Sequence, residues 1–222
     1  MRPQSQTDAG LLSTAGADPA RWEEVVRRFE EEDAEGVVRK GQILFAGSSS
    51  ITRWQLDRYF SRKDLVNRGF GGSLLAEVAF LCQRYLVAPS PAQIVLYAGD
   101  NDIGCGAAPA QVLASFRVFL AKMSRHLPGV PILFFSIKPS PLRHHLMDRM
   151  RETNRLIKEE IEGRPSVRFL DVFTPMLSAS GNLRPELYAE DNLHLSHEGY
   201  LLWARLVAPF LVSEQFSTGR TG

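Results

Sequence analysis

Four short stretches of the chain carry side chains that together could perform acyl transfer. Residues 47–50, 67–73 and 99–102 each follow an apolar run typical of a buried strand, and they supply serine, glycine and asparagine. Residues 191–194, which precede a helical pattern, supply aspartate and histidine. Because the loops after parallel strands meet at one edge of a doubly wound sheet, we expect these stretches to share a site.

The chemistry available to such a group of residues is nucleophilic attack by a serine. A serine hydroxyl is a weak nucleophile at neutral pH and needs a base within hydrogen-bond reach. His194 can be that base, and Asp191, three residues earlier and about one helical turn away, can orient its imidazole. The backbone N–H groups of Gly72 and Ser49 and the side-chain amide of Asn101 are candidate donors to the oxyanion.

The elements that must position these residues follow from the alternation of strand and helix patterns. Strands are predicted at residues 43–46, 65–67, 94–97, 132–135 and 167–170, and helices at 74–86, 109–126, 147–162 and 198–211. Strands that are apolar on nearly every residue and alternate with helices favour a parallel sheet covered on both faces. The predicted fold class is therefore α/β, as one three-layer α/β/α sandwich around a five-stranded parallel sheet.

A further helix is predicted ahead of the first strand. Asp18 and Pro19 suit an N-cap followed by proline at the first helical position. Trp22, Val26 and Phe29 recur at helical spacing, which indicates an apolar stripe that packs onto the domain. The predicted organisation is a flexible tail over residues 1–17, a single domain over 18–213 and a C-terminal tail over 214–222.

Composition limits the classes of partner. The 222 residues carry a net charge of +1, so nothing indicates nucleic acid or an anionic membrane as the main partner. The chain has no apolar stretch near the roughly 20 residues of a membrane span, and residues 1–17 have no apolar core of a signal peptide. We therefore expect a cytoplasmic protein as the sequence stands, with a small-molecule substrate. The oligomeric state stays open, a homodimer included.

These stretches together resemble the SGNH hydrolase superfamily, also called GDSL-type esterases and lipases. The family is named for a serine, a glycine, an asparagine and a histidine from four blocks. Residues 45–49 match the first block and align Ser49 with the nucleophile, although Ser48 replaces the usual aspartate. Gly72 matches the second block, Asn101 the third, and residues 191–194 the Asp-x-x-His of the last. Four blocks in order make a specific signal.

The resemblance covers residues 18–211, because the leading helix and the loop 136–141 are also similar to a bacterial subgroup that has Gly-Ser-Ser-Ser in the first block. It implies the SGNH hydrolase fold, with a flavodoxin-like sheet, and a serine ester hydrolase that needs no metal or organic cofactor. It implies the catalytic residues Ser49, Asp191 and His194 and an oxyanion hole of Ser49, Gly72 and Asn101. Because no long apolar lid is evident, we expect small acyl esters, such as an O-acetylated sugar or a lysophospholipid.

Several residues keep a structural alternative. Ser49 could cap a helix, and Ser48 and Ser50 are expected to cap or support the turn. Gly71 is an alternative to Gly72 as the oxyanion glycine, and Asp102 is interpreted as part of the loop structure. The alternative function is a non-enzymatic flavodoxin-like module that binds phosphate or sugar at residues 47–52.

The remaining histidines and the two cysteines are expected to be structural or exposed. Cys82 lies in a helical pattern and suits a buried position, whereas Cys105 follows the third block in a loop. His197 is expected to face solvent, and His126 ends a helix, where a cation suits the helix dipole. His144 and His145 are expected in a solvated loop, with the border of the substrate cleft as the alternative, and no clustered spacing suggests a metal site.

Overall fold

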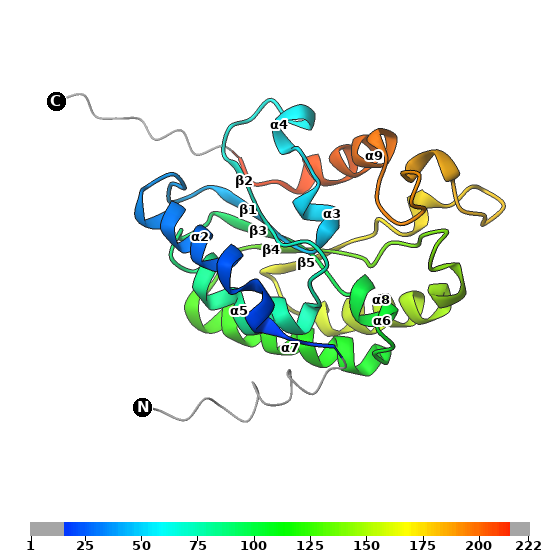
Figure 1. Ribbon diagram of the computed structural model, residues 1–222, viewed down its shortest axis with the longest axis horizontal. Coiled ribbons are helices and arrows are strands. Elements are labelled where there is room, and N and C mark those ends of the chain that lie inside the picture. The colour runs from blue at the N-terminus through cyan, green and yellow to red at the C-terminus, as the bar shows by residue number, and fades with distance from the viewer. Residues whose placement is uncertain (1–15, 214–222) are drawn as a thin grey trace.

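A five-stranded parallel sheet forms the centre of the computed structural model, which describes residues 16–213 (Figure 1). The strands are β1 (Ile43–Gly47), β2 (Leu65–Gly69), β3 (Gln93–Tyr97), β4 (Ile132–Phe135) and β5 (Val167–Leu170). Their order, β2-β1-β3-β4-β5, is that of a flavodoxin-like sheet and confirms the predicted fold class. Residues 1–15 and 214–222, nearly all of the two predicted tails, lie outside the described residues.

Helices cover both faces of this sheet. One layer holds α2 (Glu23–Ala34), α5 (Leu75–Leu86), α7 (Pro109–His126) and α8 (Met147–Ile161), whose apolar side chains share one hydrophobic cluster. The other layer holds α3 (Ser49–Thr52), α4 (Leu56–Tyr59) and α9 (His197–Val207), with a second cluster. The short α6 (Asp100–Gly104) follows β3 directly. Turns of 3-10 helix lie at Pro19–Trp22, His144–Leu146, Thr174–Met176, Pro185–Leu187 and Ala208–Phe210.

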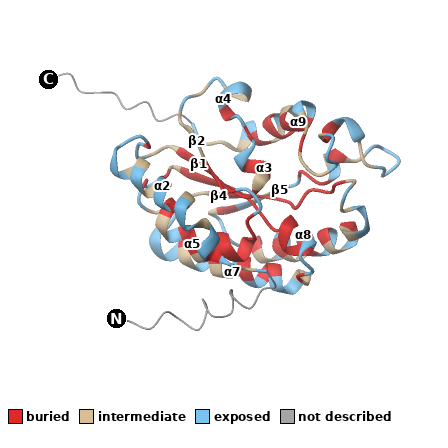
Figure 2. Ribbon diagram, viewed as in Figure 1, coloured by how far each residue is buried: buried red, intermediate tan, exposed pale blue. Residues whose placement is uncertain are grey.

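Alternate residues of β1 serve the two layers. Leu44 and Ala46 belong to the cluster under α5 and α7, while Ile43 and Phe45 belong to the cluster under α9. All four are fully buried, and the central strands are red along their length in Figure 2. This burial on both faces explains why the strands read as continuous apolar runs.

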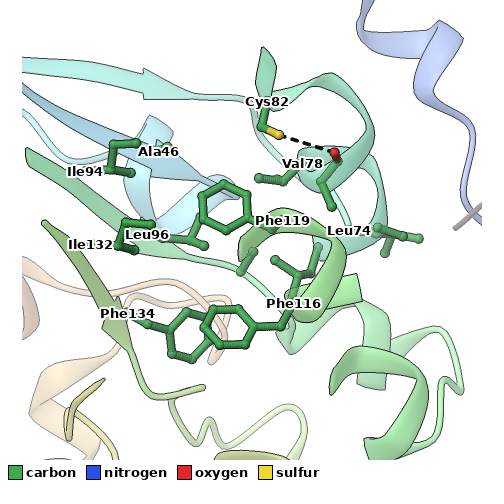
Figure 3. Packing of buried hydrophobic residues seen from close by; sticks show 14 of the residues in the cluster. Ala46, Leu74, Val78, Cys82, Ile94, Leu96, Phe116, Phe119, Ile132 and Phe134 are labelled. Atoms are coloured by element: carbon green, nitrogen blue, oxygen red, sulfur yellow. Dashed lines mark hydrogen bonds between the residues drawn. The ribbon is translucent and has the colours of Figure 1, made fainter. Parts of the chain in front are cut away.

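Aromatic and aliphatic side chains fill the space between the sheet and α7 (Figure 3). Phe116 of α7 lies against Phe134 of β4, with ring centroids 4.8 Å apart. Cys82 of α5 is fully buried, as predicted, and its thiol donates to the carbonyl of Ala79 at 3.3 Å. Cys105 is exposed, also as predicted.

The turn that leaves β1 requires a glycine. Gly47 has a φ of +129°, and a Cβ there would lie 1.8 Å from the carbonyl oxygen of Tyr97 on β3. Only glycine allows the two strands to approach this closely while the chain turns into α3. Ser48 and Ser49 are thereby held at the carboxyl edge of the sheet.

The leading helix packs onto the domain, as its stripe predicts. The Asp18 carboxylate accepts from the N–H of Ala20 at 3.2 Å, and Val26 and Phe29 are buried. Beneath it lies Glu77 at the start of α5, a fully buried carboxylate that accepts from the Trp22 indole N–H at 2.8 Å. The segment therefore has a polar attachment as well as an apolar one.

Several predicted bounds differ from the structure by one or two residues, and two assignments were wrong by more. The last helix, predicted over 198–211, ends at Val207 and continues as a 3-10 turn, because Pro209 has no N–H to extend the helix. Residues 99–102, predicted as a loop, include the start of α6. Asp102 in this helix is fully buried, and its Oδ2 accepts from the N–H of Leu75 at 2.8 Å.

Asp102 makes the stability of the fold depend on pH. Burial raises the pKa of Asp102 from 3.8 to about 7, although hydrogen bonds from the start of α5 oppose the change. Between these values the folded chain holds a proton that the unfolded chain has released, so the carboxyl lowers stability as pH rises through this window. The loss from pH 5 to pH 8 should be about 3 kcal/mol, at about 1.4 kcal/mol per pH unit below pH 7.

We predict that Asp102→Asn removes this part of the pH dependence. Urea unfolding at pH 5 and pH 8 should show a smaller fall in the free energy of unfolding for the variant than for the wild type. Asp57→Asn, on the exposed face of α4, is the matched control and should keep the wild-type difference. If the free energy of unfolding of Asp102→Asn falls between pH 5 and pH 8 by as much as that of the wild type, the pKa of the Asp102 carboxyl is not raised.

Candidate active site

The side chains of Ser49, His194 and Asp191 form one hydrogen-bonded line. His194 Nε2 lies 3.0 Å from Ser49 Oγ, and His194 Nδ1 lies 2.5 Å from Asp191 Oδ2. Ser49 begins α3 directly after β1, whereas His194 lies 145 residues later, ahead of α9. The structure thus brings Ser49 together with the Asp191–His194 pair, which the sequence analysis placed in a different loop.

A tight turn, and not a helix, sets the spacing of Asp191 and His194. Asp191 Oδ1 accepts from the N–H of Leu193 at 3.0 Å and of His194 at 2.8 Å. Asn192 has a φ of +56°, in the left-handed region that asparagine tolerates. The two residues were expected to lie about one helical turn apart, and the structure shows a tight turn instead. Their side chains are nevertheless within hydrogen-bond distance.

The same contacts keep Asp191 ionised. The hydrogen bond from the His194 ring, together with the backbone N–H groups of His194 and Leu193, holds the pKa of Asp191 well below its usual range. A carboxylate there fixes the Nδ1–H tautomer of the imidazole and leaves Nε2 free to accept a proton from Ser49. The arrangement suits general base catalysis.

The groups predicted to bind an oxyanion line one open pocket of about 350 Å³ with Ser49 and His194. Gly72 has a φ of +85°, and no backbone hydrogen bond among residues 16–213 uses its N–H or that of Ser49. Asn101 lies on the same wall and donates one Nδ2–H to the carbonyl of Ser73 at 3.1 Å. Gly71 also lines the pocket, so the choice between the two glycines stays a prediction.

Ser48 and Ser50 support the turn through their backbones. Both are buried, and the Ser48 hydroxyl makes no hydrogen bond within the part of the chain that the structure describes. Its carbonyl accepts from the N–H of Ile51 and of Thr52, at 2.9 and 3.1 Å. The Ser50 carbonyl accepts from the Tyr200 hydroxyl at 3.0 Å. Of the two expected roles, support of the turn is confirmed, while the Ser48 side chain makes no cap hydrogen bond to α3.

Residues after β4 contribute to the site and were missed by sequence reasoning. Lys138 is almost fully buried, and its Nζ donates to the carbonyl of Leu193 at 2.6 Å. Burial lowers the pKa of Lys138 to about 8. The N–H of Leu142 donates to the carbonyl of Asn192 at 3.0 Å. The rule that identified three strand ends would also have identified this fourth one.

The other histidines lie away from this line. His144, His145 and His197 are exposed, and His197 Nδ1 lies 3.0 Å from the Tyr59 hydroxyl. Within residues 16–213 no three His, Cys, Asp or Glu side chains are grouped as metal ligands would be. Over the same residues, no helix has the length and apolar character needed to cross a bilayer.

Comparisons with known proteins agree with this architecture. Platelet-activating factor acetylhydrolase IB subunit alpha1 of Homo sapiens is 24% identical over 193 residues, which cover 81% of this chain and 78% of that protein. A Streptococcus pneumonia structure assigned as a platelet activating factor is 24% identical and covers 92% of this chain and 96% of its own, with a TM-score of 0.78. An acetylxylan esterase of Geobacillus stearothermophilus, solved as a catalytic mutant, is 15% identical, covers 80% and 99%, and has a TM-score of 0.62.

A family model describes most of the domain. Residues 14–202 match the model of the GDSL-like lipase/acylhydrolase family, a span that includes all four sequence blocks. The family assignment agrees with an α/β fold whose strand ends carry the block residues. The chain belongs to the GDSL-like lipase/acylhydrolase family, whose members hydrolyse esters.

Proposed function

We propose that this protein is a serine ester hydrolase that cleaves short acyl esters, with Ser49 as nucleophile. The observation that carries the proposal is the hydrogen-bonded line from Ser49 through His194 to Asp191. A nucleophile, a base and an orienting carboxylate in this order are what acyl transfer through a serine requires. Family membership supports the reaction class.

The reaction proceeds in two halves. Ser49 Oγ attacks the ester carbonyl while its proton passes to His194 Nε2, and the negative charge collects on the carbonyl oxygen. The N–H groups of Ser49 and Gly72 and the Asn101 amide donate to that oxygen. The alcohol then leaves with the proton from His194, and an acyl group remains on Ser49. Water, deprotonated by His194, releases the carboxylic acid and restores the serine.

The pocket beside Ser49 favours a short acyl group. Of the described residues that line it, Leu193 alone has a large apolar side chain, and the others are small or polar. A long acyl chain would find little apolar surface there to offset the loss of its own freedom. Two of the similar proteins, an acetylhydrolase and an acetylxylan esterase, support an acetyl or other short-chain ester as the substrate. Carbohydrate O-acetylesterase and lysophospholipase are the candidate subtypes.

A non-enzymatic phosphate- or sugar-binding module has less support. Such a module would use the hydroxyl groups after β1 as ligands. The Ser49 hydroxyl instead lies within hydrogen-bond distance of an imidazole that a carboxylate orients. That arrangement has no role in cradling a phosphate.

Replacing the nucleophile should abolish catalysis and leave the fold intact. We predict that Ser49→Ala lowers kcat/KM on p-nitrophenyl acetate by about 10⁴-fold or more, because no other group can form the acyl intermediate. Ser48→Ala, a matched control whose hydroxyl makes no hydrogen bond with described residues, should retain most of the activity. Near-normal turnover by Ser49→Ala would contradict the proposal.

The acyl preference can be measured with a series of esters. We predict that kcat/KM falls in the order p-nitrophenyl acetate, butyrate and octanoate, with octanoate at least about tenfold below acetate, which corresponds to about 1.4 kcal/mol. The physical reason is that, among the described residues lining the pocket, only Leu193 offers a large apolar side chain to a longer acyl group. A rising profile would instead indicate a lipid groove and overturn the assignment to short acyl groups.

A further inference from the structure

Arg143 joins the loop after β4 to the predicted oxyanion hole. Its Nη2 donates to Asn101 Oδ1 at 3.0 Å, and its Nη1 donates to the carbonyl of Asp100 at 2.8 Å and to Asp100 Oδ2 at 3.1 Å. The Arg143 side chain is 17% exposed and the Asp100 side chain 5% exposed. The guanidinium is thus a largely buried cation that contacts two consecutive residues of α6.

These contacts decide which way the Asn101 amide faces. The two ends of an asparagine amide have nearly the same shape, so only their hydrogen-bond partners distinguish them. A guanidinium can only donate, and therefore Oδ1 must face Arg143 and Nδ2 must face away. The carbonyl of Ser73, which accepts from Nδ2 at 3.1 Å, requires the same orientation.

The orientation leaves one donor for the reaction. Asn101 has two Nδ2–H bonds, of which Ser73 receives one. The other has no partner among residues 16–213, and Asn101 lines the pocket that contains Ser49. A cation that donates to Oδ1 also polarises the amide and makes its remaining N–H a stronger donor.

Gly104 provides the space in which the guanidinium lies. A Cβ at this position would come within 2.9 Å of Arg143 Cζ and 3.0 Å of its Nη2. Because Gly104 ends α6 with no positive φ, an alanine there would not strain the backbone. The added methyl would move the guanidinium, which is the far end of a flexible side chain.

We propose that Arg143 is a positioning residue that orients and polarises the Asn101 amide for the oxyanion. The proposal rests on the proposed function, because it assumes that Asn101 acts as an oxyanion donor. Arg143 does not line the pocket that contains Ser49. Its effect should therefore appear in kcat rather than in KM, and only while Asn101 is present.

The test is a double-mutant cycle on p-nitrophenyl acetate. Arg143→Lys keeps a positive charge for Asp100 but loses the planar guanidinium that reaches both residues. We expect it to lower kcat about tenfold or more and to change KM less than about threefold. This loss is part of the roughly 10²–10³-fold fall in kcat that follows removal of a whole oxyanion donor. In the Asn101→Ala background the same change should alter kcat less than about twofold.

Two further variants separate positioning from general damage. Gly104→Ala leaves Arg143 in the sequence but displaces its guanidinium, so it should also lower kcat. Thermal unfolding should show that this variant folds. Arg149→Met is the matched control, because Arg149 also donates to a backbone carbonyl nearby, that of Gly106 at 3.1 Å, and should leave kcat unchanged.

Equal losses for Arg143→Lys in the wild-type and Asn101→Ala backgrounds would overturn the proposal, since they would show that Arg143 does not act through the amide. So would wild-type kcat in both Arg143→Lys and Gly104→Ala. Ser49→Ala, measured beside them, distinguishes the two claims. If Ser49→Ala stays active, the proposed function fails; if it is inactive while Arg143→Lys is normal, only the role of Arg143 fails.

Discussion

The convergence of chain segments at the carboxyl edge of a parallel sheet is the constraint on which the whole site depends. A bond of 3.0 Å between Ser49 Oγ and His194 Nε2 requires that two segments 145 residues apart be held to within tenths of an ångström. Gly47 contributes by letting β1 approach β3 so closely that no side chain would fit. The two buried layers then keep these strands in place. The hydrogen-bonded line of Ser49, His194 and Asp191 is therefore a consequence of tertiary packing.

The loop after β4 contacts both the turn that carries Asp191 and His194 and the helix that carries Asn101. Lys138 Nζ and the N–H of Leu142 donate to the carbonyls of Leu193 and Asn192, the two residues between Asp191 and His194 in the turn. A residue further along the same loop, Arg143, contacts α6, which carries Asn101, the proposed oxyanion donor. Two buried cations here hold neighbouring groups in position. A buried ammonium and a buried guanidinium are costly to desolvate, and each is satisfied by hydrogen bonds that also fix a neighbouring functional group.

The sequence predicted the parts of the fold that follow from local patterns. The bounds of β4, β5 and α7 agree with the structure to the residue, because a buried strand or an amphipathic helix is recorded directly in the order of its apolar residues. The short α3, α4 and α6 were not predicted, since one helical turn has no period to detect. The end of α9 was placed four residues late because apolar residues continue past Pro209, where the backbone can no longer extend the helix.

The candidate site was predictable as a set of residue types and only partly as geometry. Ser49, Asp191 and His194 were identified from their loops, but the turn at Asn192 and the backbone role of Ser48 depend on dihedral angles that no pattern encodes. Lys138 and Arg143 were missed for a different reason: a buried cation looks like an ordinary surface residue until its partners are known.

The central claim, that Ser49 is the activated nucleophile, is tested most directly by covalent trapping. Incubation with paraoxon transfers a diethylphosphoryl group to an activated serine and releases p-nitrophenolate, and peptide mass spectrometry locates the adduct. We expect a single adduct on Ser49, with its formation greatly slowed in His194→Ala. An adduct on Ser48 or Ser50, or none at all in a folded protein, would contradict it.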